Sequence, residues 1–142
     1  MPTDMSKYPK DWKEIRNRIL LRAGGNEDDP RVGARCEHCG LQNYDVVARC
    51  GGVLMFVKSP YVSHEDARRA KIDAEKHTGL GYSVVVLTIS HIHDMNPQNV
   101  DESNLAALCQ KCHNSHDVQY RKRNRATTRR ARIVENGQAV LI

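Results

Sequence analysis

The sequence predicts a small α+β domain built around one strand–loop–strand–helix unit. An almost continuous run of β-branched and apolar residues, Tyr82 to Ile89, is followed by a polar loop, a short apolar segment at 105–108 and a segment of helical composition. Two Cys-x-x-Cys pairs lie at 36–39 and 109–112. Only 39% of the 142 residues are apolar and 5% are aromatic, which is little for a core without a cross-link. We therefore expect a metal ion to staple this unit.

The first element is predicted to be an N-terminal helix at 8–24. Apolar residues recur at helical spacing from Trp12 to Ala23, so one face of the helix is apolar. Pro9 suits the first turn, where its missing N–H group costs nothing. Gly24 and the glycine after it end the helix. We expect the apolar face to pack on the cysteine-containing core.

Residues 43–80 are predicted to form an insertion, a β-hairpin followed by a second helix. Apolar segments at 44–48 and 53–57 flank two consecutive glycines, which favour a tight turn. The helix is predicted over about 65–77, because Ser63-His64-Glu65-Asp66 resembles a capping box and a Gly-Leu-Gly sequence stops the helix afterwards. Few of its residues are apolar, so we expect it on the surface.

The strongest chemical signal is the set of paired cysteines, Cys36, Cys39, Cys109 and Cys112. Two such pairs supply the four thiolates of a tetrahedral structural zinc site. The gap of 69 residues between the pairs is long for a compact zinc ribbon, so a separate element must be inserted. The alternative of four unpaired buried cysteines is disfavoured. Cys50 lies outside both pairs and is interpreted as a small core residue.

A second group of polar residues lies where the predicted strands, loop and helix meet: His91, His93, Asp94, Asn104, His113 and Asp117. His113 and Asp117 are four residues apart and share a helix face. His91 and His93 are two apart and share a strand face. If the main strand runs antiparallel to the short strand at 104–108, these two faces converge. The group then predicts a site for one divalent ion.

Basic residues are concentrated near the C-terminus. From residue 118 to the end, the chain has seven basic residues and one acidic residue, Glu135. Such a segment favours contact with a polyanion. The seven are Arg121, Lys122, Arg123, Arg125, Arg129, Arg130 and Arg132.

The remaining composition bears on the cellular compartment. No apolar run is long enough to span a bilayer, and the N-terminus has no signal-peptide pattern. We expect a cytoplasmic protein with no membrane partner, in which the cysteines bind metal rather than form disulfides. The oligomeric state is left open by the sequence.

Several motifs together resemble the HNH endonuclease family, also called ββα-metal nucleases. The motifs are Leu87-Thr88-Ile89-Ser90-His91-Ile92, then Asn104-Leu105, then Leu108-Cys109-x-x-Cys112-His113. The pair at 36–39 matches the upstream knuckle of the zinc-containing branch. The N-terminal sequence Tyr8-Pro9-Lys10-Asp11-Trp12 is similar to that of small bacterial and phage HNH proteins.

The resemblance implies a role for each matched residue. His91 corresponds to the general base that activates water, and Asn104 to the residue that holds the loop and orients that base. His113 corresponds to a metal ligand, and Asp117 to a second ligand in some branches. The family usually has Asp or His where this chain has Ser90. Either His93 or Asp94 then replaces this metal ligand, or the ion is bound by fewer protein groups and more water molecules.

The sequence-based expectation is a single HNH domain spanning 1–142, with a zinc-stapled core at 36–117 and a basic segment at 118–142. Its expected function is metal-dependent DNA hydrolysis, nicking or double-strand, with structural Zn²⁺ and catalytic Mg²⁺, Mn²⁺ or Ni²⁺. The alternative is a catalytically weak or inactive DNA-binding module on the same fold, which Ser90 favours. An RNA target and a role as a protein-binding inhibitor are less favoured alternatives.

Overall fold

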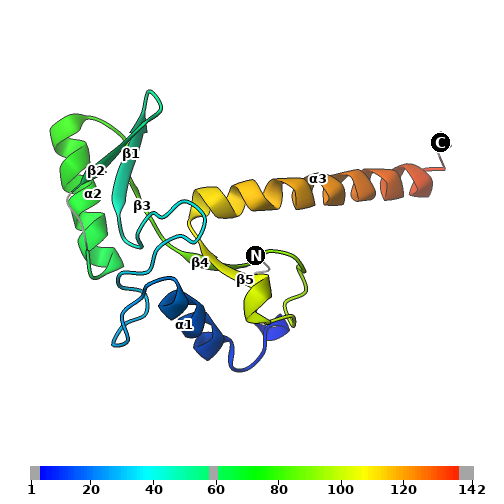
Figure 1. The fold of residues 1–142 in the computed structure, drawn as a ribbon. Helices are drawn as coiled ribbons and strands as arrows, with labels where there is room; N and C mark the ends of the chain where they lie inside the picture. Colours follow the sequence, from blue (N-terminus) through cyan, green and yellow to red (C-terminus); the bar gives the residue numbers. More distant parts are fainter. Residues whose placement is uncertain (1–3, 58–60, 138–142) are drawn as a thin grey trace.

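The computed structural model of the chain describes residues 4–57 and 61–137 and has an α+β fold (Figure 1). Residues 138–142 of the predicted basic segment therefore lie outside the described residues. The elements are η1 (Met5–Lys7), α1 (Trp12–Arg22), β1 (Val46–Cys50), β2 (Val53–Val57), α2 (His64–Thr78), β3 (Ser83–Val84), β4 (Thr88–His91), η2 (Glu102–Asn104), β5 (Leu105–Leu108) and α3 (Gln110–Glu135). The η elements are single turns of 3-10 helix.

Helix α1 buries the apolar face that the sequence predicts. Its buried side chains, Trp12, Ile15, Ile19 and Leu20, join the core that also contains β4 and β5. The helix begins at Trp12 rather than at Pro9, because Asp11 is its N-cap and the Pro9 carbonyl accepts a hydrogen bond from the Trp12 N–H at 3.1 Å. The predicted first turn is therefore wrong, while the predicted packing is confirmed.

The predicted hairpin is confirmed, with β1 antiparallel to β2 and Cys50 opposite Val53. Gly51 and Gly52 have φ values of +57° and +81°. A two-residue turn with positive φ at both positions matches the twist of the flanking strands, and glycine adopts it without strain. The first strand begins two residues later than predicted, because Asp45 instead accepts a hydrogen bond from the N–H of Val85 at 2.7 Å.

Helix α2 follows the predicted capping pattern and covers the hairpin. Its N-cap, Ser63, accepts a hydrogen bond from the Asp66 N–H at 3.1 Å, and Gly79 ends the helix with φ of +69°. Ala67 is its one buried residue, which confirms the predicted surface position. In Figure 1, α2 and the hairpin lie together at one side of the molecule.

The predicted continuous strand over 82–89 is wrong, because the chain divides it between two sheets. Ser83–Val84 forms β3 and pairs with β1 in a sheet of order β2-β1-β3, while β4 pairs with β5. Between them, the Leu87 N–H donates to the side-chain oxygen of Asn43 at 2.9 Å. A β-branched run favours extended backbone but does not specify its hydrogen-bond partner, so the sequence pattern misses the crossing.

Strands β4 and β5 and helix α3 form the unit that carries the candidate site. The strands are antiparallel, with Thr88 opposite Leu108 and His91 opposite Leu105, so the arrangement supposed for the convergence of the strand and helix faces is present. Helix α3 begins directly after its N-cap, Cys109, and has 26 residues. The predicted basic segment continues this helix as far as Glu135, and the later turns of α3 project away from the other elements (Figure 1).

The buried apolar residues form two clusters. The larger cluster joins α1, the Cys36 loop, β4, β5 and the start of α3. The smaller one lies between the hairpin, α2 and Tyr82. The candidate site lies on the larger cluster, and the insertion has a core of its own.

Among the described residues, no helix has both the length and the apolar composition needed to cross a membrane.

The α1 packing predicts different effects for two adjacent leucines. Leu20 is 3% exposed and Leu21 is 38% exposed. Leu20→Ala leaves a cavity in the larger cluster and should lower the free energy of unfolding by about 2–5 kcal/mol. Leu21→Ala is the matched control and should cost about 1 kcal/mol or less. Urea denaturation of both variants with saturating zinc measures the difference; equal costs would contradict the packing of α1.

Candidate functional site

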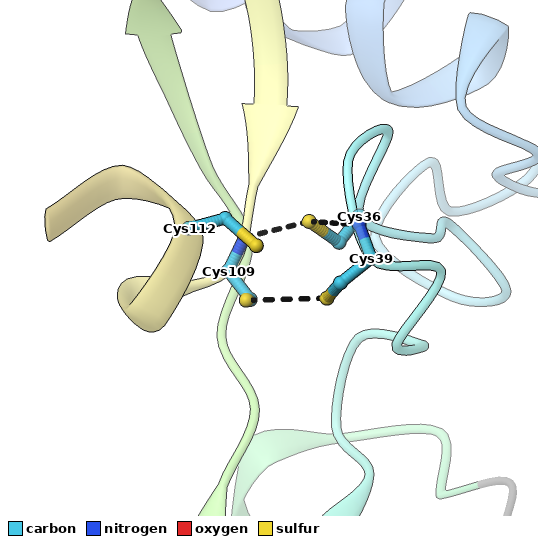
Figure 2. A group of neighbouring side chains, drawn as sticks. All are labelled: Cys36, Cys39, Cys109 and Cys112. Carbon is cyan, nitrogen blue, oxygen red and sulfur yellow. Dashed lines mark hydrogen bonds between the residues drawn. The ribbon is translucent and has the colours of Figure 1, made fainter. Parts of the chain in front are cut away.

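The four paired cysteines come together in one group. Their sulfur atoms all lie within 4.8 Å of one another, and the Sγ atoms of Cys39 and Cys109 are 3.6 Å apart (Figure 2). Cys36, Cys109 and Cys112 are buried, and Cys39 is exposed. Four thiols converging on one point could hold a metal ion such as zinc. The structure thus confirms the grouping that the spacing predicts.

Each half of this group is positioned by its local backbone. In the first half, Gly40 has φ of +80° and its N–H donates to the Cys36 carbonyl at 2.9 Å, which closes a tight turn. In the second half, Cys109 caps α3 and Cys112 lies in its first turn. The Cys109 N–H donates to the Cys36 sulfur at 3.3 Å. A helix N-terminus favours negative charge, so it favours the thiolate forms that metal binding requires.

The thiols of the cysteine group differ in the direction of their pKa shifts. Burial opposes ionisation of Cys36, but hydrogen bonds from backbone N–H groups outweigh it and lower the pKa of that thiol to about 7. Burial raises the pKa of Cys39 and of Cys112. One thiolate therefore forms readily and disfavours its neighbours. A metal ion bound there would supply the positive charge that favours ionisation of all four.

A buttress of Arg22 and Glu37 fixes the Cys36 loop against β5. The Glu37 carboxylate receives two hydrogen bonds from the Arg22 guanidinium, at 2.8 and 2.9 Å. The same carboxylate accepts from the Ala107 N–H at 2.8 Å, and Arg22 also donates to the Leu105 carbonyl at 2.6 Å. Sequence reasoning missed both residues, because a charged spacer inside a Cys-x-x-Cys pair carries no signal of its distant partner.

Cys50 is exposed at the end of β1, so its interpretation as a small core residue is wrong. The burial pattern of β1 explains this, since Val46 to Ala48 are buried and Arg49 and Cys50 are not. The turn residues Gly51 and Gly52 that follow it are exposed as well.

The histidine cleft is a hollow of about 350 Å³ beside β4 and α3. It brings together His91, His113 and Asp117 from the predicted polar group. Ser90 also lines it, as does Arg121 from the next turn of α3. A strand end and a helix face therefore converge here, as the spacing predicts.

His91 is held in the cleft by aromatic packing. Its ring is stacked on Trp12 of α1, with centroids 5.8 Å apart and planes inclined by 12°, and Tyr8 lies 6.1 Å away. Burial lowers the pKa of His91 below its usual 6.5, although the Pro97 backbone and Asp94 act in the opposite direction. The buried Nε2 atom has no hydrogen-bond partner among the described residues. Burial therefore favours the neutral form of the ring.

His113 and Asp117 form a pair on one face of α3. The His113 Nε2 atom lies 3.1 Å from an Asp117 oxygen, and the His113 Nδ1 atom lies 2.9 Å from the hydroxyl of Thr88. Both side chains are mostly buried. Among the described residues, the four cysteines are the one group of three or more ligating side chains close enough to share an ion. An ion at His113 and Asp117 would therefore have two protein ligands.

Asn104 holds the loop that follows His91. Its side-chain oxygen accepts hydrogen bonds from the N–H groups of His93 and Asp94, at 2.9 and 2.8 Å, and its amide donates to the Asp94 carbonyl at 2.8 Å. These contacts correspond to the loop-holding role that the resemblance implies. Asn104 is itself 4% exposed, so the loop is anchored in the core.

His93 and Asp94 are not brought into the histidine cleft. β4 ends at His91, so the two-residue alternation that would place His93 beside it stops there. Both residues are exposed. The Asp94 carboxylate accepts hydrogen bonds from the Asn96 N–H and the Asn99 side-chain amide, each at 3.0 Å, and so stabilises the loop. The geometry gives neither residue a place beside His113.

All seven basic residues of the predicted DNA-contacting segment are exposed on α3. Arg121 lines the histidine cleft, and Asn124 lines both that cleft and an open hollow on one side of α3, which we call the arginine groove and to which no other described helix or strand contributes. Arg125, Arg129 and Arg132 line the arginine groove. Because they share Asn124, the two hollows are adjacent along α3.

The chain matched none of the protein-family models, curated proteins or solved structures with which it was compared. Its resemblance to the HNH endonucleases thus remains one of motifs. The geometry and chemistry of its own residues support the functional proposal.

The cysteine group predicts one Zn²⁺ per chain, on which folding depends. Cys36→Ser or Cys112→Ser should abolish stoichiometric zinc and lower the melting temperature, as should chelation of the wild-type protein. Cys50→Ser is the matched control and should change neither. Metal analysis and thermal melting measure both quantities. An unchanged melt in a zinc-free protein would contradict the prediction.

Proposed function

We propose that this protein is a metal-dependent DNA endonuclease of the HNH type, with structural zinc at its four cysteines. The observation that carries the proposal is the histidine cleft, where His91, His113 and Asp117 share one hollow with Arg121. A general base, a candidate ion-binding pair and a phosphate-binding cation are the groups that phosphodiester hydrolysis requires.

His91 would act as the general base. Burial lowers its pKa, so the ring is neutral near pH 7 and can accept a proton. Stacking on Trp12 fixes the ring, and Asn104 fixes the backbone on its C-terminal side, with its carbonyl accepting from the Ile92 N–H at 2.9 Å. The unpartnered Nε2 atom is the atom that would take the proton of the attacking water.

His113 and Asp117 fit a small divalent cation. Adjacent ligands on an octahedral ion with bonds of 2.0–2.1 Å are about 3 Å apart, and the His113 Nε2 and Asp117 oxygen atoms are separated by 3.1 Å. The Thr88 hydroxyl can accept the proton on Nδ1, which leaves the Nε2 lone pair free for the ion. When bound, such an ion stabilises the negative charge that develops on the scissile phosphate and leaving oxygen.

The departure at Ser90 favours a loosely held ion. Ser90 lines the histidine cleft, so the residue at the family's ligand position does face the site but offers a hydroxyl instead of a carboxylate. Mg²⁺ in proteins usually keeps several water ligands and often has one or two carboxylates. Two protein ligands from α3, supplemented by water and a substrate phosphate, are thus a workable shell.

The basic face of α3 would hold the DNA backbone. His113, Asp117, Arg121, Arg125 and Arg129 follow one another at intervals of four, so each is adjacent to the next in a row that turns by about 40° around the helix axis at each step. Arg121 lies in the histidine cleft, and Arg125 and Arg129 lie in the arginine groove. A phosphate backbone laid along this row would pass directly into the cleft. Contacts of this kind do not depend on sequence.

Structural zinc would keep the two halves of the site in register. Cys112 immediately precedes His113 in α3, and Cys109 immediately follows β5. An ion on the four thiols therefore fixes the first turn of α3 against the strand that pairs with His91. In this proposal, zinc is the metal of the cysteine group and its role is to support the site.

A DNA-binding module without catalytic activity is the second candidate. The observation that favours it is the small number of metal ligands. Two ligating side chains, His113 and Asp117, lie at the ion position, and Ser90 adds neither a carboxylate nor an imidazole. In this alternative, the arginine groove binds DNA and the histidine cleft is inert.

Catalysis predicts that His91→Ala lowers the rate of plasmid nicking by about 10²–10⁴-fold, because the general base is lost while the ion-binding pair remains. Supercoiled plasmid is incubated with each variant, with Mg²⁺ or Mn²⁺ and without a divalent ion. His77→Ala is the matched control, since His77 is exposed on α2, and it should cut like wild type.

Ser90→Asp extends the same assay. The added carboxylate should lower the Mg²⁺ concentration for half-maximal cutting, while His113→Ala should raise it. If the His91→Ala variant cuts as fast as wild type, the endonuclease proposal is wrong. If wild type binds DNA without cutting it under any of these ions, the second candidate is the correct one.

If the arginine groove binds DNA, substitutions on the two faces of α3 should differ in their effect on DNA affinity. Arg125→Ala with Arg129→Ala should weaken binding to unrelated DNA sequences alike and flatten the slope of log affinity against log salt by about one to two units, one for each lost phosphate contact. Arg123→Ala with Arg130→Ala removes the same charge from outside the arginine groove and is the control. Equal losses in both pairs would show that net charge alone matters.

A further inference from the structure

A separate cavity of about 350 Å³ lies between α1, the loop after it and the start of α2. We call it the Arg16 cavity. It is lined by Arg16, Arg31 and His64, with Asn43, Tyr44 and Thr88 completing its polar wall. None of the described residues that line it is Asp or Glu. The hollow is therefore positively charged and offers donors but no competing carboxylate.

The two guanidiniums of this cavity have no anionic partner. Across residues 4–57 and 61–137, neither guanidinium makes an ion pair with a carboxylate, and the one carboxylate bonded to Arg31 is that of Asp29, which accepts from its backbone N–H at 3.1 Å. The Arg16 Nε atom is buried and makes no hydrogen bond. Burial and the nearby Arg31 charge both lower the pKa of Arg16. Two like charges held together around an unsatisfied buried donor are what an anion would relieve.

The walls of the cavity are fixed in place before any ligand binds. Asn43 is 3% exposed, and its amide donates to the Arg31 carbonyl at 2.8 Å while its oxygen holds the Leu87 N–H. Tyr44 is the one described non-glycine residue with positive φ, at +69°, and its ring lies 6.5 Å from that of His64. A backbone in this region is costly for a bulky side chain. The surrounding hydrogen bonds maintain it.

The Arg16 cavity adjoins the histidine cleft across β4. Ile89 lines both hollows, and Thr88 lines the cavity while bonding to His113 in the cleft. Asn124 already links the cleft to the arginine groove. The three hollows thus form one series: arginine groove, histidine cleft, Arg16 cavity. Each is lined by at least one arginine.

We propose that the Arg16 cavity is a phosphate-binding pocket that holds one backbone phosphate of the DNA strand on the side of the histidine cleft opposite α3. The inference rests on the proposed function for the identity of the ligand. The planar guanidinium is suited to phosphate oxygens, which can accept from two of its N–H groups at once. A strand fixed on both sides of the cleft would present the intervening phosphodiester to His91.

The first test uses inorganic phosphate as the probe on zinc-loaded protein without other divalent ions. Phosphate should shift the side-chain Nε–H NMR resonances of Arg16 and Arg31 in a saturable manner, and raise the melting temperature. Arg16→Gln should abolish both effects. Arg18→Gln is the matched control on the same helix, because Arg18 is exposed and ion-paired with Glu102 at 3.5 Å, and it should respond like wild type.

The second test identifies the source of the phosphate. In the His91→Ala background, Arg16→Gln should weaken binding to duplex DNA and flatten the salt slope by about one unit, the value for one lost phosphate contact. Arg18→Gln should leave the slope unchanged. Arg31→Gln provides a second variant at an exposed position, in case Arg16→Gln does not fold.

The outcomes separate this inference from the endonuclease proposal. Phosphate shifts at Arg16 together with a flatter DNA slope support it, even if the wild-type protein cuts no DNA. Phosphate shifts with an unchanged slope overturn it, because the pocket then takes a free phosphate compound. Absence of the phosphate shifts also overturns it. DNA cutting that needs His91 but not Arg16 would leave the endonuclease proposal standing alone.

Discussion

The crowding of four thiols into one group is the constraint on which the rest of the structure depends. Their sulfur atoms come from a loop after α1 and from the first turn of α3, two places far apart in the chain. Hydrogen bonds and burial drive the pKa values of these thiols in opposite directions. The arrangement becomes favourable when a cation is shared among them. A cation bound there would fix the first turn of α3 against the loop that carries Cys36 and Cys39.

Helix α1 contacts the histidine cleft near its start and supports the cysteine group at its end. Near its start, Trp12 stacks on His91, and at its end, Arg22 holds the Glu37 carboxylate that joins the cysteine loop to β5. Arg16, between them, lines the cavity on the far side of β4. One helix therefore connects the cysteine group, the histidine cleft and the Arg16 cavity. Its packing in the larger apolar cluster keeps their relative positions constant.

Features with a local cause could be predicted from the sequence. The capping of α2 by Ser63 and the Gly51-Gly52 turn depend on neighbouring residues, and the grouping of the cysteines follows from residue type and spacing. Features decided by distant contacts could not. The division of the 82–89 segment depends on which sheet each half joins, and the Arg22–Glu37 pair depends on tertiary proximity. The expectation that His93 shares a face with His91 was wrong, because side chains two residues apart share a face only within a strand and β4 ends at His91.

The insertion between the cysteine pairs, with its separate apolar cluster, also affects how the chain can fold. Closing a loop of 69 residues costs only about 1.2 kcal/mol more than closing one a quarter as long, because the entropy of loop closure grows with the logarithm of length. The hairpin and α2 are formed by contacts near in sequence, which are made sooner than remote ones. They shorten the effective span between the cysteine pairs. The metal group would then be completed late, after the intervening residues have already condensed.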